Sequence, residues 1–174
     1  MASVLNVLRR ILGVLSTGAL WLAGIGMVGM TATVGWQVFA RYVLNDTPSW
    51  AEPLTLQLMG WFILLGAAVG VRESFHLGLD LLQQALPAAL GRVLEAVNLL
   101  LILGFGIAMA WYSVQLAIGT WTATIPVLDL PGGFDFIPLI IGGVLIALFA
   151  AERLVELAAG LEHEAAVDGV RELA

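Results

Sequence analysis

The chain has 174 residues, of which 60% are hydrophobic and 11% charged, with a formal net charge of −6 and no cysteine. Soluble globular domains carry about a quarter charged residues, and here the charges are clustered, so that long uncharged segments separate them. This pattern excludes a soluble globular domain and indicates a membrane protein, because a helix needs about 20 apolar residues to cross the hydrocarbon. Without cysteine there is no disulfide or thiolate site. The chain has no lysine, and its arginines are too scattered to form a basic patch that would bind a nucleic acid.

Residues 11–40 form the first predicted span, which we expect to be retained rather than cleaved. This uncharged segment would be about 45 Å long as a helix, about twice the length of the apolar core of a secretory signal. The polar turn at residues 45–48 ends it, and a second span is predicted over residues 50–71. Pro53 is compatible with that second helix because it falls in the first turn, where its missing N–H has no partner within the helix.

The rest of the chain predicts a surface helix, two further spans and a tail. Residues 77–86 are too short to cross a bilayer, and their polar side chains fall on one helical face, which is typical of a helix lying along the membrane surface. The third span is predicted over residues 94–120 and the fourth over residues 136–151, followed by an acidic cytoplasmic tail at residues 152–174. The expected fold class is an all-α integral membrane protein, with four transmembrane helices in one membrane domain over residues 1–174.

The distribution of arginine predicts the orientation of the chain in the membrane. Cytoplasmic loops are enriched in Lys and Arg near the ends of spans. With both termini in the cytoplasm, Arg41 is the one arginine outside and the other six lie inside; the opposite orientation would reverse that ratio. The sequence therefore predicts a multi-pass protein with both termini cytoplasmic.

None of the predicted spans has a charge at mid-depth. Carriers usually place ionisable groups or broken helices near the middle of the bilayer. The charge-free segments of this chain are residues 11–40, 53–71, 96–128 and 136–151. We therefore expect that the chain does not itself carry a polar solute. A Gly66-x-x-x-Gly70 face, which permits close approach of another helix, instead suits a protein that braces a membrane partner.

A motif runs from the end of the first predicted span to the residues after the second. Its parts are Arg41-Tyr42, Ser49 to Glu52, Gly66 to Ala68, Arg72-Glu73, and then His76, Gly78 and Asp80. In this pattern the chain resembles the DctQ-like family, the small membrane subunit of tripartite ATP-independent periplasmic (TRAP) transporters. Pro53 stands where that family usually has a second acid.

The resemblance implies a scaffold subunit in the bacterial inner membrane, surrounded by membrane lipids. Its implied partners are a large DctM-like membrane subunit, which carries the solute and couples it to sodium, and a periplasmic solute-binding protein, which delivers a carboxylate-bearing compound. Sodium is expected in the large subunit, and no cofactor or metal is expected in this chain. Two alternatives stay open. A self-contained oligomeric carrier or channel would need a polar ring, and a membrane anchor of a redox complex would need haem ligands.

The motif and the outer loops supply the candidate contact residues. Candidates for the partner interface are Arg41, Trp50, Glu52, Gly66, Gly70, Arg72, His76 and Asp80; candidates for contacts of the periplasmic loops are Asp46, Asp129 and Asp135. Simpler interpretations exist for several of them. Arg41 could snorkel and pair with Asp46 or Glu52, Trp50 could belong to the interfacial aromatic belt, and Arg72 could be a cytoplasmic stop signal. No catalytic constellation is visible, so we expect no enzymatic activity.

Overall fold

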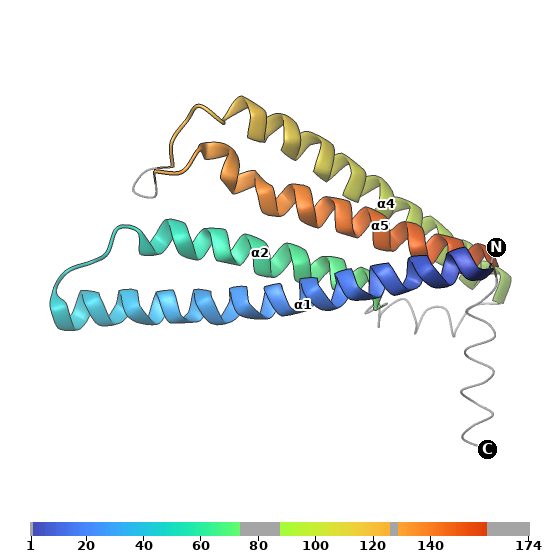
Figure 1. Ribbon diagram of the computed structural model, residues 1–174, viewed down its shortest axis with the longest axis horizontal. Coiled ribbons are helices and arrows are strands. Elements are labelled where there is room, and N and C mark those ends of the chain that lie inside the picture. The colour runs from blue at the N-terminus through green and yellow to red at the C-terminus, as the bar shows by residue number, and fades with distance from the viewer. Residues whose placement is uncertain (1, 74–87, 126–128, 160–174) are drawn as a thin grey trace, which may run out of the picture.

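The computed structural model describes residues 2–73, 88–125 and 129–159 (Figure 1). The predicted surface helix at residues 77–86 lies outside the described residues, as do His76 and Asp80. The described residues form four helices that are long and apolar enough to cross a membrane. They are α1 (Ala2–Phe39), α2 (Ala51–Arg72), α4 (Ala88–Gly119) and α5 (Ile137–Ala159). The predicted all-α fold with four transmembrane helices is confirmed.

The helical segment that begins with α1 continues beyond residue 40, the predicted end of the first span. It passes into a π-helical turn, Ala40–Leu44, and Asn45 then ends it with a left-handed conformation, at φ 51°. Asparagine adopts this conformation more readily than most residues because its short polar side chain can hydrogen-bond locally. The Asn45 N–H donates to the Ala40 carbonyl, and so does the N–H of Asp46, at 3.2 Å. The chain therefore turns sharply at this point and returns toward α2.

The four helices form two antiparallel hairpins, α1 with α2 and α4 with α5, which meet where α2 packs against α5 (Figure 1). We call the end that holds the N-terminus and the last turn of α2 the terminal end. The other end, where α1 joins α2 and α4 joins α5, is the loop end. The hairpins converge at the terminal end and diverge toward the loop end. A short 3₁₀ helix, η2 (Gly132–Phe136), leads into α5 at the loop end.

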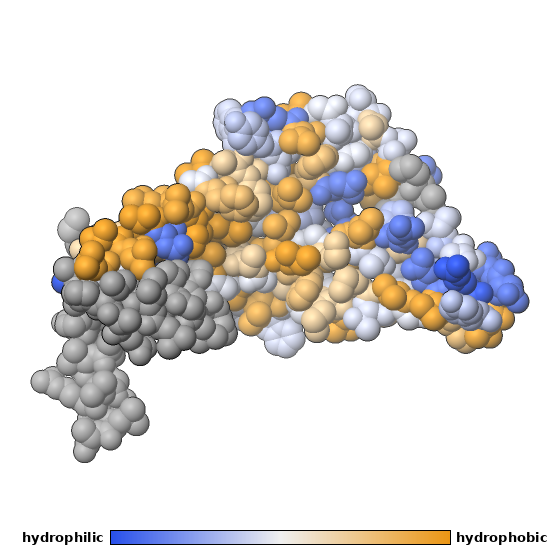
Figure 2. All heavy atoms as spheres, turned by 180° about the vertical axis from the view of Figure 1, so that it is seen from behind, coloured by the Kyte–Doolittle hydropathy of each residue, from blue (hydrophilic) through white to orange (hydrophobic). Residues whose placement is uncertain are grey.

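Close packing in this bundle depends on small residues. The two core clusters are contributed by α1, α2 and α5, with Ala19, Ala23 and Ala68 among their members. Between α4 and α5, a Cβ placed on Gly143 would lie 2.8 Å from the Ala110 nitrogen, so only glycine fits there. Helices in lipid gain nothing from hiding apolar surface from one another, and close backbone packing replaces that driving force. Most apolar side chains point outward, as Figure 2 shows for one face.

Candidate functional site

Ion pairs at the terminal end connect α5 to each of the other three helices. Arg9 on α1 donates from Nε to Glu156 Oε1 at 2.7 Å, and Arg72 on α2 donates from Nε to Glu152 Oε2 at 3.0 Å. Also from α5, the Arg153 guanidinium lies 3.6 Å from Glu95 Oε1 on α4. The terminal end is thus held together by charge pairs across helices, whereas the middle of the bundle is held by small apolar residues.

Arg72 makes several contacts besides its ion pair. Its NH2 group also approaches the Arg9 carbonyl oxygen at 3.4 Å, and its guanidinium lies 5.8 Å from the centroid of the Phe149 ring. Its partner Glu152 has only 5% of its side chain exposed, and Glu152 Oε1 has no hydrogen-bond partner among the described residues. The sequence suggests Arg72 as a contact to a partner chain, but its contacts in the structure join α2, α5 and α1 of the same chain.

A cleft of about 490 Å³ opens at the loop end between the start of α2 and the start of α5. Glu52 and Asp135, which the sequence suggests as separate contacts, line it together, along with Ser49 and Gln57. Gln57 Nε2 donates to the Phe134 carbonyl at 3.0 Å and so connects α2 to η2. The remaining lining is apolar, from Pro53, Leu56, Gly60, Ile125, Pro138 and Leu139. The cleft therefore combines two carboxylates with an apolar wall.

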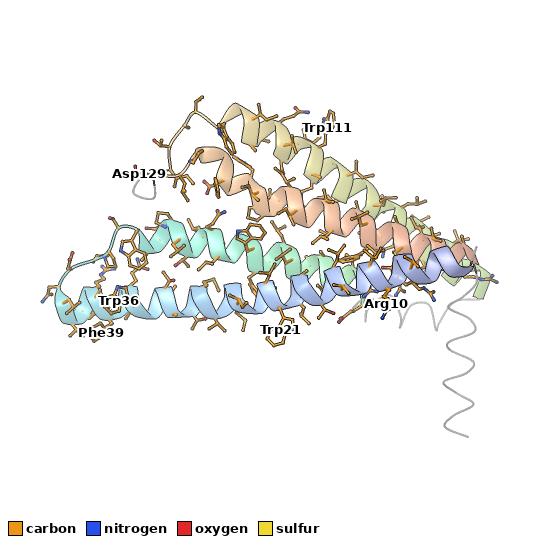
Figure 3. The ribbon with its side chains drawn as sticks, in the orientation of Figure 1. Arg10, Trp21, Trp36, Phe39, Trp111 and Asp129 are labelled. Atoms are coloured by element: carbon orange, nitrogen blue, oxygen red, sulfur yellow. The ribbon has the colours of Figure 1, made fainter. Side chains whose placement is uncertain are left out.

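The other loop-end candidates are exposed. Arg41 lies with its guanidinium carbon 5.9 Å from the centroid of the Tyr42 ring, and the structure shows no ion pair from it to either Asp46 or Glu52. Asp129 sits on the α4–α5 loop with a left-handed φ of 50° (Figure 3). Asp46 and Trp50 are also exposed. These side chains are therefore open to contact from outside the chain.

The Gly66 and Gly70 face of α2 is not covered by any described helix of this chain. A Cβ placed on either glycine would meet no atom of another described helix within 4 Å. By contrast, the glycines that do pack closely lie elsewhere: Gly26 faces α2, and Gly106 and Gly143 join α4 to α5. The face predicted for helix packing is thus present but open, so a partner for it would have to come from outside the described residues.

Sequence reasoning missed the charge pairs at the terminal end. The sequence predicts no pairing for Glu95 or Arg153, and it places Glu152 and Glu156 in the acidic cytoplasmic tail that begins at residue 152. A signal was present, because Glu152 and Glu156 are four residues apart and so share one face of a helix. No group of three or more His, Cys, Asp or Glu that could hold a metal occurs among the described residues.

Comparison with known proteins identifies the family to which this chain belongs. The model of the family "Tripartite ATP-independent periplasmic transporters, DctQ component" matches residues 30–160. The C4-dicarboxylate TRAP transporter small permease protein DctQ of Vibrio cholerae serotype O1 is 35% identical over 95 residues, which are 55% of this chain and 38% of that protein. The sialic acid TRAP transporter small permease protein SiaQ of the same organism is 26% identical over 116 residues, covering 53% of this chain and 67% of that protein.

A putative TRAP transporter small permease protein of Haemophilus influenzae is 26% identical over 129 residues, which are 72% of this chain and 78% of that protein. The chain thus covers less than half of the Vibrio cholerae DctQ protein but most of the Haemophilus influenzae one. The resemblance carried by the motif from Arg41 to Asp80 is confirmed by a match that extends well beyond it. Four membrane-spanning helices and this family match lead to one conclusion: the chain belongs to the DctQ component family and is a small membrane subunit of a TRAP transporter.

Proposed function

We propose that this subunit is a fixed scaffold that braces the large, solute-carrying membrane subunit during sodium-coupled uptake that depends on a solute-binding protein. The observation that carries the proposal is the position of the charges. The described ion pairs lie at the terminal end, Arg41 and four carboxylates lie at the loop end, and the middle of all four spans is uncharged. A chain that carried a polar solute would need polar groups at mid-depth, whereas a scaffold needs anchored ends and faces that pack closely.

The proposal includes a carboxylate-type solute and a defined orientation. The relatives are named for C4-dicarboxylates and for sialic acid, and both kinds of compound bear carboxylates. The terminal end, with Arg9, Arg10, Arg72, Arg92 and Arg153, is cytoplasmic, and the loop end, with Arg41, is periplasmic, as the positive-inside rule favours. The membrane is the bacterial inner membrane, and the solute-binding protein acts from the periplasmic side.

The large subunit binds, in this proposal, along the open glycine face of α2. Glycine costs a helix interior about 1 kcal/mol relative to alanine, so two glycines one turn apart weaken the helix, and no packing contact among the described residues offsets that cost. The gain arises if another helix packs there, because the missing side chains let two backbones approach closely. Gly66 and Gly70 both have that open space beside them.

A double substitution tests this interface. Gly66→Leu with Gly70→Leu should leave the unfolding of the isolated subunit unchanged or slightly favour its helix, because both new side chains enter open space. In the complex it should lower recovery of this chain through a tagged large subunit and lower uptake. The matched control is Gly104→Leu, at an open glycine on α4. Full recovery and full uptake in the double variant would show that the glycine face is not the contact.

A further inference from the structure

We propose that residues 36–44, the loop-end part of α1 and its π-helical turn, project out of the bilayer as a stalk that docks a water-soluble protein. The docked protein is the solute-binding protein of the same transporter, an assignment that rests on the proposed function. The stalk is the part of this subunit that the solute-binding protein contacts. The stalk presents apolar and aromatic side chains around one cation, Arg41.

The register of α1 against α2 shows how far the stalk extends. Gly26 lies against the backbone of Leu58 and Phe62, and Gly29 lies against Leu58. In an antiparallel pair this register places Trp36 beside the first residues of α2, and Figure 3 shows Phe39 nearer the tip of α1 than Trp36. Residues 37–44 therefore continue past the start of α2, by about 12 Å at 1.5 Å per residue.

The length of α2 determines where the membrane surface lies. With 22 residues, α2 is about 33 Å long, close to the roughly 30 Å of hydrocarbon in a bilayer. Glu52 and Arg72 stand at its two ends, so a strong tilt would draw a charge into the hydrocarbon. Because α1 packs along α2, the two helices share one tilt. Trp36 and Trp50 then lie at the same boundary, where tryptophan is enriched.

The tip of the stalk consequently stands outside the lipid. A bilayer with its headgroups is about 40–45 Å thick, which leaves about 5–7 Å of headgroup on each side. Tyr42, Val43 and Leu44 are six to eight residues beyond Trp36, or about 9–12 Å. Their side chains are 74%, 60% and 55% exposed. Apolar side chains of this kind are unfavourable in water, and contiguous apolar patches on a surface mark interaction sites.

The depth of the tip and the charges around it indicate the kind of partner. Side chains beyond the headgroups face water, where lipid does not cover them and a water-soluble protein can reach them. The described charges at the loop end are Arg41 and four carboxylates, those of Asp46, Glu52, Asp129 and Asp135. A complementary partner is a soluble protein with an apolar hollow for the tip, an acid opposite Arg41 and a basic rim facing Asp46 and Glu52, the carboxylates next to the stalk in sequence.

The stalk is built to present this surface rigidly. Two N–H groups, those of Asn45 and Asp46, converge on the Ala40 carbonyl and close the π-helical turn. Ala40 itself is 3% exposed, and the rings of Trp36 and Phe39 lie 5.8 Å apart. A surface that is already ordered loses less conformational freedom when a partner binds.

The first test measures exposure of the stalk and needs no transport. The natural chain has no cysteine, so Val43→Cys introduces a single thiol. In membranes that contain both membrane subunits, a membrane-impermeant maleimide should label Val43→Cys, and saturating solute-binding protein should slow labelling at least fivefold. Leu130→Cys, an apolar residue on the other loop, is the matched control and should show little protection. Absence of labelling at Val43→Cys would place the stalk in lipid or under the large subunit and overturn the proposal, as would labelling that the binding protein does not slow.

The second test measures docking in the assembled complex. The triple variant Tyr42→Ser, Val43→Ser, Leu44→Ser should be recovered with the large subunit within twofold of the wild-type level. Its affinity for the solute-binding protein should fall at least tenfold, and uptake should recover as that protein is raised in concentration. Leu130→Ser should change affinity less than twofold. Unchanged affinity, or loss of the large subunit, would refute the stalk as the docking site. If the wild-type complex itself shows no uptake driven by the binding protein, both the proposed function and the assignment of the binding protein as the partner are wrong. Labelling of Val43→Cys would still report on the depth of the stalk.

Discussion

Removing the Arg72 charge should loosen the terminal end of the bundle, because it leaves a buried carboxylate without its partner. Arg72→Met keeps much of the length of the side chain but removes the donor to Glu152, whose side chain is 5% exposed. Breaking a buried ion pair by removing one partner costs about 3–5 kcal/mol. Arg72 is itself 26% exposed, so we expect the lower end of that range, about 3 kcal/mol.

Two further variants separate the pair from its surroundings. Arg72→Met with Glu152→Met removes both charges, and replacing a buried pair by apolar residues is often neutral. The double variant should therefore be more stable than Arg72→Met alone, by about 2 kcal/mol. Arg9→Met is the control, because the Arg9 side chain in its pair with Glu156 is 42% exposed and an exposed pair contributes at most about 1 kcal/mol.

The measurement is equilibrium unfolding of the purified subunit in mixed micelles, followed by tryptophan fluorescence at increasing denaturing detergent. Helix separation rather than loss of helix is the expected transition, since each span satisfies its own backbone hydrogen bonds in an apolar medium. The reasoning is refuted if Arg72→Met destabilises no more than Arg9→Met. It is equally refuted if the double variant is no more stable than Arg72→Met alone, because the two charges would then not be coupled.

Three further outcomes are expected. In intact cells, a membrane-impermeant reagent should label cysteines at Asp46 and Asp129 but not at Glu73; labelling at Glu73 alone would reverse the proposed orientation. The purified subunit, reconstituted alone in liposomes, should take up no carboxylate under a sodium gradient, and saturable uptake would contradict the scaffold role. Gly143→Val should disrupt packing of α4 on α5 and destabilise the subunit by about 1–3 kcal/mol or more, because even a Cβ there would lie 2.8 Å from the Ala110 nitrogen. Gly66→Val, the control, should not destabilise the subunit. A stable Gly143→Val subunit would show that the helices can shift apart.

The sequence alone was sufficient to predict four membrane-spanning helices. Whether a segment enters lipid depends on its own length and hydropathy, and a helix satisfies its backbone hydrogen bonds internally. For the same reason the polar turn at residues 45–48 correctly separated the first two spans. The family was also readable from the motif between Arg41 and Asp80, because that motif lies within one continuous stretch of chain.

Only the tertiary structure decided which residues meet. Arg72 and Glu152 are 80 positions apart, and both look like ordinary span-end charges until packing of α2 on α5 places them 3.0 Å apart in a buried position. Glycine spacing was equally ambiguous: Gly66 and Gly70 fit a packing motif yet contact no other described helix, whereas Gly106 and Gly143 meet across α4 and α5. The length of the stalk depends on the register of α1 against α2 as well as on hydropathy. Such pairings depend on the relative placement of helices, which is set by contacts between segments distant in sequence and leaves no periodic signal within either one.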